Sequence, residues 1–267
     1  MSIKWKKSSM KKRIIIILSI IIIIILIILG IINNYKPFHF TNKMFFGKKS
    51  STKLYNEKYE DIDTIYIDVD NAIINIKNGN EDTIKVKVLS NRKNIQLKAY
   101  NGKLSMKVEN YEGCFFCKMN VIEITAPSTF KDYMTISNRH GHINIENFPN
   151  TTMAITSKLG NISVKEAKVV KVKSRRGSIN IGKVANAYIY SFWGRLKIDE
   201  VDNLFSNSTL LDMNVDYVKK YININNDFGD INIKKADILR DSIIEVGFGE
   251  INVKKLNEDT GKLKKKN

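Results

Sequence analysis

The sequence predicts an all-β protein: a β-solenoid, or β-roll, of about seven coils of roughly 17–20 residues each, preceded by alternating antiparallel strands and one N-terminal transmembrane helix. Three observations predict this fold. Residues 14–32 form an apolar run, residues 62–124 alternate apolar and polar side chains, and residues 141–256 repeat a short strand motif seven times. Alternation with a period of two places apolar side chains on one face of a strand.

The membrane segment is the run from Ile14 to Ile32, which is interrupted only by Ser19 and Gly30. As a helix this run spans roughly 28 Å, close to the hydrocarbon core of a bilayer. A cleaved signal peptide is the alternative, but its apolar region is shorter and ends in a small-residue cleavage site. No such site follows Gly30, so the sequence favours an uncleaved signal-anchor.

Charge predicts the orientation of the anchor. Residues 1–13 carry six basic residues and no acid, which indicates a cytoplasmic N-terminal tail. We therefore expect a single-pass protein of the plasma membrane with an extracellular C-terminal domain. Residues 33–60 are interpreted as a juxtamembrane stalk or a disordered linker, residues 61–256 as the β-strand-repeat ectodomain, and residues 257–267 as a Lys-rich tail.

The chain is strongly basic, with 44 Lys and Arg against 27 Asp and Glu and a formal net charge of +17. After the basic N-terminal tail, 38 basic and 27 acidic residues remain, a formal +11. Such a surface attracts anionic polymers non-specifically. The predicted location favours cell-wall polyanions or lipid headgroups as the partners of this surface. We expect no nucleic acid as a partner. A Lys-rich surface that serves only solubility is the alternative.

The first part of the ectodomain alternates in short runs such as Ile65–Val69 and Ile84–Val88. Asn78-Gly79 and Asn101-Gly102 fall between such runs, and Asn-Gly pairs favour the positive φ angles of tight hairpin turns. We therefore expect antiparallel hairpins before the repeats.

The second part contains the internal repeat, Gly-x-Ile-x-Ile followed by a polar turn. Its copies start at Gly141, Gly160, Gly177, Gly194, Leu211, Gly229 and Gly249. One copy cannot bury its apolar row alone, whereas stacked copies can. The near-constant spacing of the starting positions favours a solenoid over an antiparallel sandwich.

Each repeat glycine is expected at a corner between two strands, where a positive φ or a close backbone approach excludes a side chain. Leu211 takes the place of glycine in the fifth copy, so we expect this corner to be altered.

Basic and aromatic residues gather next to the expected corners, which would stack into one ridge. They are Arg139, His140, Lys158, Arg175, Arg176, Phe192, Trp193 and Arg195. Aromatic residues and Arg are the usual anchors of binding surfaces, so this ridge is the candidate binding site. Exposure that follows from turn geometry alone is the alternative.

The two cysteines and a pair of histidines are the remaining candidates for chemistry. Cys114 and Cys117 form a C-x-x-C that allows a local disulfide outside the membrane, with two free thiols as the alternative. A thioredoxin-like site needs a helix after the first cysteine, and a zinc site needs further ligands. His140 and His142 share a strand face without a visible third ligand. We therefore expect no metal, no cofactor and no enzymatic activity.

The alternating section that ends at Ala126-Pro127, and the repeats after it, resemble a bacterial β-strand-repeat family catalogued as adhesins of unknown function. The segment Thr156–Val164 carries the closest match. The resemblance implies a surface module that binds an envelope partner, either an anionic cell-wall polymer or another envelope protein. It also implies an alternative role as an accessory or regulatory protein of an envelope-stress or membrane-protein assembly system. It implies no catalytic residues.

Overall fold

The computed structural model describes residues 53–90, 95–108, 119–258 and 260–266. These residues form strands and turns and contain no helix. No segment of this described part therefore has the length and apolar character of a membrane-crossing helix. The expected span at residues 14–32 lies outside the described residues.

The described strands join in one 13-stranded sheet that folds round a core. In chain order they are β1 (Lys53–Tyr59), β2 (Thr64–Gly79), β3 (Ile84–Ser90), β4 (Ile95–Tyr100), β5 (Lys103–Val108), β6 (Asn120–Pro127), β7 (Tyr133–His140), β8 (Ile143–Leu159), β9 (Ile162–Phe228), β10 (Ile231–Ile238), β11 (Ser242–Phe248), β12 (Ile251–Glu258) and β13 (Leu263–Lys266).

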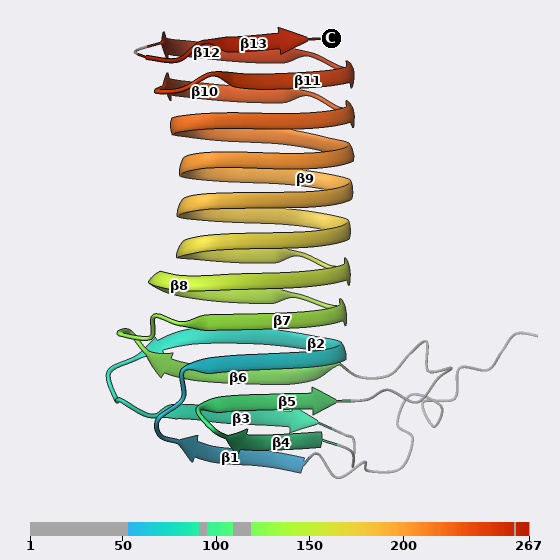
Figure 1. Ribbon diagram of the computed structural model, residues 1–267. Helices are drawn as coiled ribbons and strands as arrows, with labels where there is room; N and C mark the ends of the chain where they lie inside the picture. Colours follow the sequence, from blue (N-terminus) through green and yellow to red (C-terminus); the bar gives the residue numbers. More distant parts are fainter. Residues whose placement is uncertain (1–52, 91–94, 109–118, 259, 267) are drawn as a thin grey trace, which may run out of the picture. The chain divides into compact units, whose positions relative to one another are not determined.

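The seven repeats form stacked coils, as the sequence predicts (Figure 1). The strands of successive coils pair in parallel, for example Ile136 with Ile155 and Ile155 with Val172. The single long strand β9 winds through several coils without a break. We number the coils 1 to 7 by their corner residues, from Gly141 in coil 1 to Gly249 in coil 7.

The strand β2 forms an additional coil before coil 1. Its first half pairs in parallel with β7, and its second half pairs in parallel with β8. The sequence analysis did not predict this coil, because it assigned the whole first section to antiparallel strands. That expectation holds for the pairs β1–β3, β3–β6 and β4–β5, and it is wrong for β2, which is parallel to β5 and β6 as well.

Only one of the two expected hairpin turns is confirmed. Asn101 and Gly102 both have positive φ, 46° and 71°, and join the antiparallel strands β4 and β5. Asn78 and Gly79 form no hairpin, because β6 lies between β2 and β3 in the sheet. Local sequence marks a turn residue, whereas the position of the next strand depends on pairing with distant residues.

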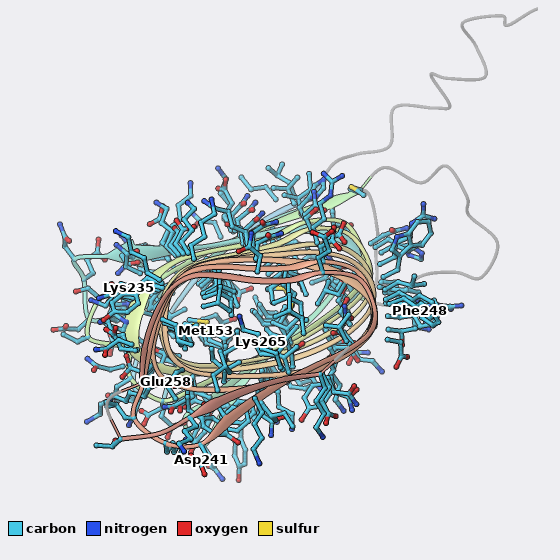
Figure 2. The ribbon with its side chains drawn as sticks, turned by 90° about the horizontal axis from the view of Figure 1, so that it is seen from above. Met153, Lys235, Asp241, Phe248, Glu258 and Lys265 are labelled. Atoms are coloured by element: carbon cyan, nitrogen blue, oxygen red, sulfur yellow. The ribbon has the colours of Figure 1, made fainter. Side chains whose placement is uncertain are left out.

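The core lies inside the coils, where every second side chain points inward. Three inward columns come from the first six repeat copies, at the first apolar place, the second apolar place and the end of the following turn. In coil 1 these residues are Ile143, Ile145 and Phe148, each no more than 2% exposed. The view along the coil axis shows the chain winding round this core, with Met153 inside it (Figure 2).

The corner glycines stack with almost no space between their backbones. A Cβ atom built on Gly160 would lie 1.8 Å from the carbonyl oxygen of Gly141, and one on Gly177 would lie 2.0 Å from that of Gly160. Gly160 also has a φ of 148°. Both facts confirm the predicted role of glycine at these corners.

The fifth corner is altered, as the sequence predicts. Leu211 is fully buried and is not among the residues with positive φ. Its carbonyl oxygen accepts a hydrogen bond of 3.0 Å from the Asn226 side chain in the next coil. The corner of β2 is Ala72, and its carbonyl accepts an equivalent bond of 2.9 Å from Asn138. Above glycine corners this inward place is instead Ser157, Ser174, Ser191, Ser208 or Val246.

Residues 51–267 form one compact unit with a continuous core of buried apolar side chains. This unit includes β1 and β13, which come from the segments that the sequence analysis assigned to the stalk and to the C-terminal tail. Because the unit holds its own core, we expect residues 51–267 to fold without the segment Met1–Ser50.

Candidate binding surface

The candidate surface is the narrow edge of the coils at the corner residues. We call it the corner ridge and define it as the two residues before and the one residue after each corner place in coils 1 to 7. Figure 2 shows Phe248 at this edge, with Lys235 near the opposite edge. Parallel pairing holds the ridge in register, for example His140 beside Leu159, Leu159 beside Arg176, and Phe228 beside Phe248.

All eight ridge residues predicted from sequence lie on this edge. Arg139, Lys158, Arg175, Arg176, Phe192, Trp193 and Arg195 are exposed, and His140 is half-buried. Their role in binding stays a prediction. Cys114 and Cys117 lie outside the described residues.

One expected ridge cation is already paired. Arg139 Nε lies 3.2 Å from a carboxylate oxygen of Asp70, which belongs to the β2 coil. The described residues provide no ion pair to Lys158, Arg175 or Arg195. His140 and His142 have no metal-binding cluster about them in the described part of the chain.

The ridge also exposes an apolar column that the sequence analysis missed. It occupies the place directly before each corner residue and includes Leu159, Trp193, Leu210, Phe228 and Phe248, which are 41%, 48%, 40%, 44% and 70% exposed. The signal was present in the sequence, because this place could have been compared through all seven copies. The prediction used it only as far as Trp193.

Ring contacts order this column. The Arg176 guanidinium lies over the Trp193 ring at 4.2 Å from its centroid. The rings of Phe228 and Phe248 stack with centroids 5.1 Å apart and planes at 10°. Exposed stacked rings on a rigid backbone present contact area at little cost in conformational entropy.

Acidic residues follow the corners in the last three coils. Asp212, Asp230 and Glu250 occupy the place after the corner in coils 5, 6 and 7. Asp212 Oδ1 accepts from the backbone N–H of Asp230 at 3.3 Å, and Asp230 Oδ1 accepts from that of Glu250 at 2.9 Å. These bonds fix the carboxylates along the edge.

The two ends of the ridge consequently carry charges of opposite sign. Coils 1 to 4 carry Arg139, Lys158, Arg175, Arg176 and Arg195 and no acid. Coils 5 to 7 carry Asp212, Asp227, Asp230 and Glu250 and no Lys or Arg. The sign of charge changes between Arg195 and Asp212, next to the exposed rings of Phe192 and Trp193.

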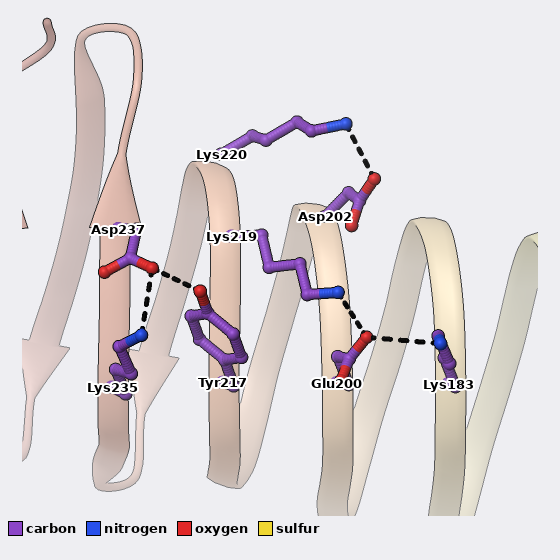
Figure 3. Close-up of polar contacts among 8 residues, drawn as sticks. All are labelled: Lys183, Glu200, Asp202, Tyr217, Lys219, Lys220, Lys235 and Asp237. Atoms are coloured by element: carbon purple, nitrogen blue, oxygen red, sulfur yellow. Dashed lines mark hydrogen bonds and ion pairs between the residues drawn. The ribbon is translucent and has the colours of Figure 1, made fainter. Parts of the chain in front are cut away.

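On the opposite edge, ion pairs join side chains of neighbouring coils (Figure 3). Glu200 contacts Lys219 and lies 3.6 Å from Lys183, while Lys220 lies 2.8 Å from Asp202. The hydrogen bond from Lys219 holds the pKa of Glu200 below its ordinary value, and Glu200 raises the pKa of Lys219.

A second group lies on this opposite edge. Asp237 accepts from Tyr217 and lies 3.1 Å from Lys235, which sits over the Tyr217 ring. The hydrogen bond from Tyr217, together with Lys235, lowers the pKa of Asp237. In both groups, partners within the chain shift the pKa values so that the side chains stay charged.

The broad outer faces carry shallow hollows. One of about 340 Å³ is bordered by Tyr66, Asp68, Gln96, Lys98, Ser105 and Lys107. Another of about 260 Å³ follows the asparagines Asn214, Asn232 and Asn252. These hollows lie between rows of side chains on a sheet surface. The first is at the lower end of the size range of ligand pockets, and the second is below that range.

Residues 62–266, which contain the β2 coil and the seven repeat coils, match the family model Toastrack DUF4097. The chain belongs to the Toastrack DUF4097 family. The resemblance stated from the sequence is thereby confirmed. No curated protein matches this chain.

Solved structures similar to this Toastrack chain share little of its sequence. A candidate adhesin from Bacteroides fragilis is 15% identical with a TM-score of 0.42, and the match covers 82% of this chain and 99% of that one. A candidate adhesin from Parabacteroides distasonis is 12% identical with a TM-score of 0.40, covering 82% and 98%. A candidate cell adhesion protein from Clostridium sporogenes is 12% identical with a TM-score of 0.37, covering 77% and 99%.

Proposed function

We propose that this Toastrack protein is a non-enzymatic binding module of the cell surface, anchored in the plasma membrane by residues 14–32. The corner ridge is its contact surface for an envelope partner. The observation that carries the proposal is the exposed stack of Arg176 on Trp193 beside Phe192, held on a rigid backbone. Such aromatic and Arg anchors dominate the energetics of protein interfaces.

The polarity of the ridge favours a protein partner over a simple polyanion. An anionic cell-wall polymer lying along the ridge is attracted by coils 2 to 4 and repelled by Asp212, Asp227, Asp230 and Glu250 in coils 5 to 7. A protein surface with both signs of charge complements the whole ridge.

A binding role also agrees with the pKa shifts of the ion-paired residues on the opposite edge. General acid–base catalysis at neutral pH requires carboxylates with raised pKa values or amines with lowered ones. Here hydrogen bonds from Lys219 and Tyr217 lower the pKa values of Glu200 and Asp237, and hydrogen bonds to Glu200 and Asp237 raise those of Lys219 and Lys235. These shifts stabilise surface charges.

The test is co-sedimentation of residues 51–267 with isolated cell envelopes, with and without their anionic polymers, at low and high salt. Replacement of Arg175, Arg176, Trp193 and Arg195 by Ala should reduce retention at least about tenfold, as loss of interface anchors does. A matched control removes three cations and one exposed ring elsewhere: Tyr100, Lys168, Lys183 and Lys254. Equal loss in both variants, or no retention of the wild type, would contradict the proposal.

The membrane arrangement has its own test. Externally added protease should digest the β-repeat domain of the full chain in wall-stripped cells, whereas full protection would contradict the proposed orientation. Exchange of residues 1–32 for an unrelated anchor should leave a surface binding module active. Loss of function after this exchange would instead support an accessory role through other membrane proteins.

A further inference from the structure

The charges of the corner ridge are antisymmetric about its centre. Coil 1 is neutralised within the chain, because Arg139 pairs with Asp70 at 3.2 Å. Coils 2, 3 and 4 then carry charges of +1, +2 and +1, and coils 5, 6 and 7 carry −1, −2 and −1. A two-fold axis between coils 4 and 5 would place each positive coil opposite a negative coil of equal magnitude.

We propose that the corner ridge binds the corner ridge of a second copy of this chain in an antiparallel, two-fold symmetric contact. This rests on the proposed function, because it names the partner of that same surface. An interface of this type presents the same patch from both subunits, so the patch must be complementary to itself when rotated. The antisymmetric charges meet that requirement.

The predicted charge pairs follow from the rotation. Arg195 of coil 4 faces Asp212 of coil 5, since each directly follows its corner. Lys158 of coil 2 lies opposite coil 7, whose ridge carries the charge of Glu250. Arg175 of coil 3 faces Asp227 of coil 6, since each lies two places before its corner, and Asp230 adds a second negative charge to that coil. A parallel arrangement would instead place equal charges opposite each other, which disfavours it.

The apolar column is complementary under the same rotation. Trp193 of coil 4 meets Leu210 of coil 5 at the two-fold axis, and Leu159 of coil 2 meets Phe248 of coil 7. Arg176 of coil 3 meets the ring of Phe228 in coil 6, where a guanidinium lies favourably over an aromatic face. Exposed apolar groups and opposite charges therefore fall into register together.

The contact is narrow. Six coils spaced ~4.8 Å apart give a strip about 24 Å long, so the interface belongs to the small, transient class. We expect weak association in dilute solution and stronger association between chains concentrated on two facing membranes. Antiparallel pairing places the two β1 ends at opposite ends of the strip, an arrangement that suits chains anchored in two facing membranes.

Cysteine cross-linking of the full chain in proteoliposomes tests the geometry. Cys114 and Cys117 are first replaced by Ser in every variant. Arg175→Cys and Asp227→Cys should cross-link efficiently when mixed and not when alone, because copies of one residue lie about three coils apart. Leu210→Cys, next to the two-fold axis, should cross-link with its own copy.

Charge reversal tests the interaction. Lys158→Glu with Arg175→Glu should weaken association at least about tenfold in sedimentation of the full chain, and so should Asp227→Lys with Glu250→Lys. All four substitutions together should restore it, since every pair is reversed. Restoration also shows that the substituted chains are folded.

The outcomes separate this inference from the proposed function. Cross-linking of Arg175→Cys with itself, or no rescue by the combined reversal, would overturn the antiparallel contact. Envelope binding that persists in that case leaves the proposed function standing with another partner. Loss of wild-type envelope binding while the cross-links form would overturn the proposed envelope partner and keep the self-association.

Discussion

The Arg176 guanidinium lies 4.2 Å from the centroid of the Trp193 ring, and both side chains are exposed at the edge of neighbouring coils. Exposed cation–π pairs contribute about 0.5–1 kcal/mol. A double-mutant cycle with Arg176→Ala and Trp193→Ala, followed by urea unfolding of residues 51–267, should give a coupling free energy in that range. Arg175→Ala serves as the control. No coupling between Arg176 and Trp193 would show that the stack is not formed in solution.

Among the residues at this edge, substitution of a corner glycine should reduce the free energy of unfolding the most. Gly160→Ala places a methyl group 1.8 Å from the carbonyl oxygen of Gly141 at a φ of 148°, so the backbones of two coils must separate. We expect a loss of about 2 kcal/mol or more in the free energy of unfolding. Lys158→Ala, in the same turn, should change it by less than about 0.5 kcal/mol. Equal thermal unfolding of both variants would contradict the role of the corner.

The buried polar residues beneath the corners should respond in opposite directions. The Ser174 hydroxyl is buried and has no hydrogen-bond partner among the described residues, so Ser174→Ala should leave stability unchanged or raise it by about 1 kcal/mol.

Asn226 donates to the carbonyls of Leu211 and Phe228 at 3.0 and 2.8 Å. Asn226→Ala leaves two carbonyls unsatisfied and should cost about 2 kcal/mol or more. Chemical denaturation of both variants measures the difference. A loss in Ser174→Ala as large as that in Asn226→Ala would show that the serine hydroxyl is bound by water or backbone.

The ion pair of Glu200 with Lys219 should make a small, pH-dependent contribution to stability. The lowered pKa of Glu200 means that its contribution is complete above the ordinary carboxyl pKa and is lost as the pH falls through the lowered value. The raised pKa of Lys219 means that its contribution is lost only as the pH rises through that value.

Glu200→Gln should therefore reduce stability at pH 7 by a few tenths of a kcal/mol, as for exposed pairs, and less at pH 2. Thermal unfolding at both pH values measures the effect, with Glu166→Gln as the control. A larger effect of Glu200→Gln at pH 2 than at pH 7 would have the wrong sign for this pair.

The repeated part of the fold was predictable because each coil repeats one set of local requirements. The glycine places, the inward columns and the altered corner at Leu211 could all be assigned from the alternation and the spacing. The β2 coil could not be assigned in the same way. Ile74 pairs with Ile143, which belongs to a distant part of the chain, and alternation shows which face is buried without showing which strand is the neighbour.

The residues of the corner ridge were likewise predicted only in part. Eight of its residues were predicted, since each lies beside a corner in the first four coils. Leu210, Phe228 and Phe248 were missed because no Lys or Arg lies beside these corners, and the prediction looked for basic residues.

By itself, the sequence determined the period, the buried rows, the glycine corners and the family, since each depends on residues within one coil. The tertiary structure decided that β2 begins the stack and that basic coils, exposed rings and acidic coils share one edge. The physical reason is the parallel hydrogen-bond ladder, which aligns the corner of each coil with the corners of the coils before and after it. Residues that are distant in the chain thereby become neighbours at a spacing of ~4.8 Å.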